Sequence, residues 1–133
     1  MSQEYDIRWR QRFENFERAL QLYQRVAEIE EPSEAETMGL VQAFEITFEL
    51  AWKTIKDYAE MQGLTPKSPR ESIKQGFQMG ILDEGRLWLE ALENRNQTVH
   101  LYDETKLTQL VPQMRGQYLS MMWQLHHRLT EDQ

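Results

Sequence analysis

The sequence SEAETMGLVQAFEITFELAWKTIKDYAEMQG, residues 33–63, carries one uninterrupted helical pattern. Ser33 followed by Glu36 has the spacing of a capping box, which marks a helix start, and Gly63 is placed to end the helix. Between these points the core-facing residues return at steps of four and three: Thr37, Val41, Phe44, Phe48, Ala51, Ile55 and Tyr58. Because such steps mark one side of an α-helix, the stretch predicts a long helix with a continuous buried face.

The segment before this helix predicts a second helix that packs against it. The same spacing runs for about 20 residues and forms one apolar stripe. Its members are Trp9, Phe13, Phe16, Leu20, Tyr23 and Ala27. Glu31, Pro32 and Ser33 interrupt the pattern, so a short turn should join the two helices.

The segment after Gly63 contains a strong helix start. Residues 68–71, Ser-Pro-Arg-Glu, combine an N-cap serine, a proline at the first helical position and a glutamate three residues after the cap. Ile73 and Phe77 are predicted to face inward. Gly80 is placed to end this short helix.

Two further helices are predicted towards the C-terminus. Asp83 is placed to cap the first and Asp103 the second. Pro112 should kink or break the last helix, because a proline inside a helix removes one backbone hydrogen bond and costs about 3 kcal/mol. The residues predicted to face the core are Leu87 or Trp88, Ala91, Leu92, Leu107, Val111, Met114, Tyr118, Met122 and Leu125.

These elements predict a single all-α domain that spans residues 1–133. We expect an up-and-down antiparallel helical bundle of four long helices and a short one. The chain also carries more large apolar residues, including Trp88 and Trp123, than the core of one small helical bundle readily buries. This surplus favours a homodimer.

The composition limits the classes of function. The chain has no cysteine and three histidines, of which His126 and His127 would diverge on a helix, so we expect no disulfide, metal site or cofactor. The formal net charge of −7 argues against a general nucleic-acid binder, which needs clustered Lys and Arg. Because no apolar run of about 20 residues and no signal-peptide layout is present, we expect a cytoplasmic protein without a membrane partner.

Two groups of basic residues leave two interpretations open. Arg8, Arg10 and Arg12 form either a basic patch for a partner or phosphate, or ordinary solvated charge on a helix. Arg70 and Lys74 lie near a predicted helix N-terminus, where an anion would also meet free backbone amides. The alternative is that they are ordinary exposed cations.

The candidate functional residues lie in the segment 93–103, where the helical pattern ends. Arg95 provides a cation that keeps its proton, and His100 provides an imidazole that titrates near neutrality. Five residues of continuous helix would put these two side chains on different faces, so the helix must end between them if they act together. Val99 and Thr98 are β-branched, and residues of this kind favour an end of the helix at this point.

Arg95 is also predicted to need a partner. It follows Trp88 and Ala91 on the same side of a helix, so it starts from a partly buried stripe. An unpaired guanidinium there would be costly, and it therefore requires a carboxylate, a phosphate or a partner chain. The candidate carboxylates within the chain are Glu49, Glu90 and Glu93.

The run Arg95-Asn96-x-x-x-His100-x-Tyr102 resembles the Arg-polar-x-x-x-His signature of the HEPN superfamily, in the form found in members paired with minimal nucleotidyltransferases. The resemblance covers about residues 6 to 125. Three other segments, residues 8–16, 42–53 and 68–70, resemble the subgroup named nucleotidyltransferase substrate-binding proteins.

This resemblance implies a toxin of a toxin–antitoxin pair, a helical homodimer with metal-independent endoribonuclease activity on single-stranded RNA. Arg95 and His100 would be catalytic and Asn96 a supporting polar residue. Tyr102 would be the residue that a cognate minimal nucleotidyltransferase adenylylates. His100 can move the proton of the 2′-hydroxyl, and Arg95 can stabilise charge on the phosphorane.

Three alternatives remain open from the residues. The chain could be a non-catalytic nucleotide- or substrate-binding subunit of a two-component nucleotidyltransferase, which the acidic net charge favours. It could be an inert dimeric adaptor. Arg95, His100 and Tyr102 could also simply fasten a helix junction. All of these share one fold, so the fold alone does not choose between them.

Overall fold

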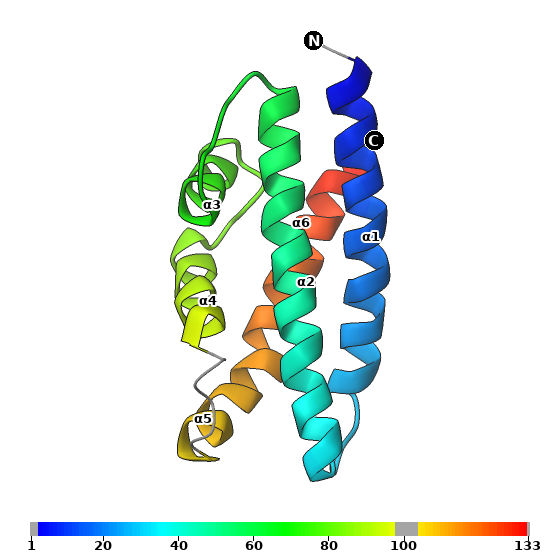
Figure 1. Cartoon of the computed structure of the whole chain (residues 1–133), viewed down its shortest axis with the longest axis vertical. Coiled ribbons are helices and arrows are strands. Elements are labelled where there is room, and N and C mark those ends of the chain that lie inside the picture. Colours follow the sequence, from blue (N-terminus) through cyan, green and yellow to red (C-terminus); the bar gives the residue numbers. More distant parts are fainter. Residues whose placement is uncertain (1–2, 98–103, 133) are drawn as a thin grey trace.

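A computed structural model describes residues 3–97 and 104–132, and in these ranges the chain forms helices and no strand. The helices are α1 (Gln3–Ala27), α2 (Glu34–Met61), α3 (Pro69–Gln78), α4 (Gly85–Gln97), α5 (Glu104–Arg115) and α6 (Gln117–Glu131). Figure 1 shows α1 and α2 side by side and antiparallel, with α3 and α4 on the other side of α2 and α6 behind it. The predicted all-α class is confirmed for these residues.

The central helix α2 begins and ends as the sequence predicts. The Ser33 hydroxyl accepts a hydrogen bond from the Glu36 amide at 3.1 Å, and the Glu36 carboxylate accepts one from the Ser33 amide at 2.9 Å. Gly63 follows the helix with φ +91°, a backbone conformation that glycine adopts without strain. The repeating residues of α2 from Val41 to Tyr58 are all buried.

Aromatic side chains of α2 contact three other helices. The ring centroids of Phe44 and Tyr118 of α6 are 5.5 Å apart, and those of Phe48 and Trp88 of α4 are 5.7 Å apart. Near the other end of α2, Tyr58 lies edge-on to Trp9 of α1 at 5.2 Å. Aromatic pairs contribute beyond the area they bury, so these contacts fix the neighbouring helices on α2.

The predicted stripe of α1 is confirmed, because all six of its residues are buried. The arginines beside the stripe make ion pairs within the chain. The pairs are Arg8 with Glu60 at 3.8 Å, Arg10 with Asp6 at 3.2 Å and Arg12 with Asp57 at 3.0 Å. This pairing favours ordinary helix charge over a basic patch for a partner.

The predicted last helix is divided in two, so the layout of four long helices and a short one is not what the described residues form. Pro112 lies inside α5, and the break comes later, at Gly116. The Gly116 amide still donates to the Pro112 carbonyl at 3.0 Å, and its φ of −112° and ψ of −95° then leave the helical region. The proposed cap Asp103 lies outside the described residues.

Two predictions around the α3–α4 connection are wrong. Phe77 does not face inward, since 54% of its surface is exposed, and its ring lies against the backbone of Gly85. Asp83 does not begin the next helix, which starts at Gly85. Its carboxylate instead forms an ion pair with Arg128 of α6 at 2.8 Å.

The tryptophans that suggested a dimer are accommodated within one chain. Trp88 is fully buried, and the indole of the partly buried Trp123 donates to Gln24 at 2.9 Å. These residues therefore give no reason for a second copy. Among the described residues, no helix combines the length and apolar character needed to cross a membrane.

We predict that Gly76→Ala destabilises the bundle, because a Cβ at Gly76 would lie 2.9 Å from Cγ2 of Ile55 and 3.0 Å from Cδ1 of Leu82. The steric cost should exceed the gain in helix propensity and lower the free energy of unfolding by about 1 kcal/mol. The control is Gly39→Ala, since no atom lies within 4 Å of a Cβ there, and it should stabilise α2. Urea unfolding followed by circular dichroism measures both, and equal changes would contradict the proposed crowding.

Candidate functional site

The last turn of α4 places Arg95 at the edge of the core. Trp88, Ala91 and Leu92 of the same helix are buried. Arg95 continues their side of the helix, and 32% of its side chain is exposed. The predicted partly buried position is confirmed.

Arg95 forms an ion pair with Glu49 of α2, which selects one of the three carboxylates that the sequence offered. Nη2 of Arg95 donates to Oε2 of Glu49. Glu49 also accepts a hydrogen bond from the indole of Trp52 at 3.1 Å and lies 3.2 Å from Nζ of Lys53. The pair joins α4 to α2 and balances part of the Arg95 charge.

These donors keep Glu49 ionised. Burial alone would raise the pKa of Glu49, but the hydrogen bonds from Trp52 and Lys53 and the charges of Arg95 and Lys53 outweigh it, so the pKa lies below its ordinary value. A lowered carboxyl pKa stabilises the fold above the ordinary pKa of the unfolded chain, and this stabilisation is lost as the pH falls through the lowered value. At neutral pH, Glu49 therefore competes for Arg95 as a full negative charge.

Asn96 is the second predicted site residue that the structure describes. Its Oδ1 accepts a hydrogen bond from Nη1 of Arg95 at 3.3 Å. The structure thus brings Arg95 and Asn96 together. His100 and Tyr102 lie outside the described residues, so their relation to Arg95 stays a prediction.

Asn94 holds the end of α4 in place, a role that sequence reasoning missed. Its side-chain amide donates to the hydroxyl of Tyr118 at 2.6 Å, and that hydroxyl donates to Gln113 of α5 at 2.9 Å. Burial, together with the charge of Glu90, raises the pKa of Tyr118, although the Asn94 hydrogen bond acts in the opposite direction. The only sequence signal was a polar residue beside the buried stripe, which does not identify a partner so distant in sequence.

Two hollows flank the end of α4. One, of about 370 Å³, is lined by Glu45, Ile46, Glu49, Leu50 and Arg95. The other, of about 240 Å³, is lined by Ser68, Pro69, Arg70, Leu92, Glu93 and Asn96. The first hollow places two carboxylates beside one cation. In the second, Arg70 is exposed and makes no ion pair with the side chains that the structure describes.

Within residues 3–97 and 104–132, no three His, Asp or Glu side chains gather as metal ligands would. His126 contacts Glu17 at 2.7 Å, and His127 contacts Glu131 at 3.3 Å. Each of these two histidines thus faces a single carboxylate.

Comparisons with known proteins place the chain in a family. A comparison with curated proteins finds no match. A protein from Thermus thermophilus, known from a crystal structure, is 34% identical, with a TM-score of 0.80 over 86% of this chain and 98% of that one. The family model described as nucleotidyltransferase substrate binding protein like matches residues 11–131. The chain therefore belongs to the nucleotidyltransferase substrate binding protein like family.

Proposed function

We propose that the chain is the non-catalytic, substrate-binding subunit of a two-component nucleotidyltransferase, and that its partner is a cognate minimal nucleotidyltransferase. The observation that carries this proposal is the ion pair of Arg95 with Glu49. RNA binding depends on clustered positive charge along the backbone, and a single cation that a carboxylate already balances does not provide such a cluster. Glu45 in the same hollow and the net charge of −7 further oppose RNA binding.

The substrate proposed for this subunit is a nucleotide. Its phosphate would meet the exposed Arg70 and the amide of Asn96 in one hollow. A phosphate that also reaches Arg95 must compete with Glu49 for the guanidinium, because both anions use the same donors. Glu49 therefore limits the affinity of the site, and the bound nucleotide would be presented to the catalytic subunit.

We predict that Glu49→Gln strengthens ATP binding several-fold and that Arg95→Gln weakens it, because the first change removes a carboxylate that competes with phosphate for the guanidinium and the second removes the guanidinium itself. Isothermal titration calorimetry measures both. Glu14→Gln on α1 is the control, since it changes the net charge by the same amount at an exposed site away from α4. Equal affinities for the parent, Glu49→Gln and Arg95→Gln proteins would refute the proposed site.

The second candidate function is that of a HEPN-type toxin, a metal-independent endoribonuclease that its nucleotidyltransferase silences by adenylylating Tyr102. It is favoured by one observation, the contact between Arg95 and Asn96 at the end of α4. In this alternative Arg95 stabilises the charge of the phosphorane and His100 moves the proton of the 2′-hydroxyl. The two candidates differ in whether RNA is cut.

If the toxin alternative holds, single-stranded RNA should be cleaved in the presence of EDTA and should carry 2′,3′-cyclic phosphate ends. Arg95→Ala and His100→Ala should each slow cleavage by about 100-fold or more, because each removes a group that acts in the transition state. Gel analysis of labelled RNA measures the rates. If the RNA stays intact after prolonged incubation, the toxin alternative is wrong and only the substrate-binding proposal remains.

We also propose a homodimer that uses the face of α2 beside Arg95. Ile46 is 50% exposed there and lines the same hollow as Leu50 and Arg95. Burial of this apolar surface against a second copy would bring the two α4 ends close together.

Light scattering should give about twice 16.0 kDa for the parent and the monomer mass for Ile46→Glu, because a buried unpaired carboxylate opposes association. Leu22→Glu is the matched control, since Leu22 is 51% exposed on α1 and should leave the dimer intact. A parent protein of monomer mass would rule out the dimer.

A further inference from the structure

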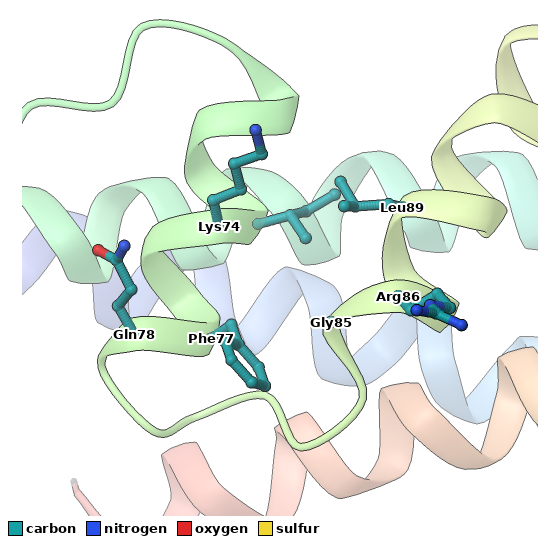
Figure 2. Close-up of a pocket in the computed structure, with 7 residues that line it drawn as sticks. Lys74, Phe77, Gln78, Gly85, Arg86 and Leu89 are labelled. Atoms are coloured by element: carbon teal, nitrogen blue, oxygen red, sulfur yellow. The ribbon is translucent and has the colours of Figure 1, made fainter.

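A largely apolar groove lies between α3 and α4, and none of its lining residues lines the two hollows at the end of α4. It has a volume of about 380 Å³, and its walls include Ile73, Phe77, Gly85 and Leu89. Figure 2 shows Lys74, Phe77 and Gln78 projecting from α3, with Arg86 and Leu89 on α4. The volume falls within the range of binding pockets in proteins, which are about 300–1,000 Å³.

Phe77 makes this groove different from an ordinary surface depression. Its ring is 54% exposed, although it follows the fully buried Ile73 by one helical turn. A Cβ at Gly85 would come within 3.2 Å of the Phe77 ring, so the absence of a side chain at Gly85 lets the ring rest on the α4 backbone. A large aromatic side chain thus lies in a concave apolar surface, an arrangement typical of interaction sites.

The rim of the groove is positively charged. Lys74 and Arg86 are exposed, and neither makes an ion pair with the side chains that the structure describes. Many other cations of the chain are paired, among them Arg10, Arg12 and Arg128. In a chain of net charge −7, two unpaired cations beside an apolar groove favour an occupant that joins an apolar group to carboxylates.

The groove also extends beyond a single pocket. A second hollow of about 530 Å³ shares Phe77, Gly85 and Arg86 with it and continues past Glu84 and Glu90. Lys74 lines only the first hollow, whereas Asp83, Glu84 and Glu90 line only the second, and Arg86 lines both. Two adjoining hollows that differ in charge in this way suit an extended peptide better than a compact small molecule. A peptide there would have a defined direction, with its carboxylates over Lys74 and Arg86.

We propose that this groove binds a peptide segment of the partner nucleotidyltransferase that carries a large apolar side chain next to acidic residues. The apolar side chain packs on Phe77 between α3 and α4, and the acidic residues pair with Lys74 and Arg86. This inference rests on the proposed function, because it takes the nucleotidyltransferase as the partner. The groove shares no lining residue with the hollow of Arg70 and Asn96 that is proposed for the nucleotide.

The test measures the affinity of the purified nucleotidyltransferase for variants of the full chain. Phe77→Ala and the double variant Lys74→Glu with Arg86→Glu should each weaken binding about 10-fold or more, as expected for a central aromatic anchor and for reversed charges. All three residues are exposed, so circular dichroism should show an unchanged helical fold. Leu22→Ala and Arg25→Glu, at exposed positions on α1, are the matched controls and should bind as the parent does.

Gly85→Ala gives a subtler variant that keeps every groove side chain. Its Cβ would displace the Phe77 ring, so binding should weaken several-fold. Full affinity in Phe77→Ala and in the charge-reversed double variant would overturn the groove proposal while leaving the partnership intact. No binding by the parent would overturn the proposed function itself. A changed mass of the variants alone in light scattering would assign the groove to a contact between copies of this chain, which also overturns the proposal.

Discussion

The aromatic contacts between α2 and its neighbours are the interaction on which the rest of the structure depends. Phe44 lies against Tyr118 of α6, and Phe48 lies against Trp88 of α4. These two residues of α2 are one helical turn apart, so a single helix face holds two other helices in register. All four rings are fully buried, and removing one would leave a cavity that close-packed helices cannot easily fill.

This packing also fixes the site. Glu49 follows Phe48 on α2, and Arg95 lies two turns after Trp88 on α4. The contact of Phe48 with Trp88 packs α4 against the part of α2 that carries Glu49, and the ion pair forms further along α4. The hydrogen bond from Asn94 to Tyr118 anchors the same end of α4. The cation at the site is therefore balanced by a carboxylate from a helix that serves mainly as core.

The sequence predicted what depends on local pattern and did not predict what depends on distant neighbours. The capping box of Ser33 and the buried stripes of α1 and α2 follow from spacing and were predicted correctly. Phe77 was predicted to face inward together with Ile73. Its ring instead lies against the backbone of Gly85, which follows a loop after α3. Asp83 is a residue type that often caps a helix N-terminus, but its carboxylate forms an ion pair with Arg128, which is distant in sequence. For the same reason, Glu49 was only one of several candidate partners for Arg95.

The central claim is that Glu49 holds Arg95, and a double-mutant cycle tests it most directly. Glu49 also contacts Trp52 and Lys53, so a single substitution would mix several effects, whereas the cycle of Glu49→Gln and Arg95→Gln isolates their mutual interaction. Urea unfolding at neutral pH should give a coupling free energy of about 0.5–1 kcal/mol, as expected for a partly exposed ion pair. A coupling indistinguishable from zero would show that the Arg95 charge is not held by Glu49 and would contradict the account.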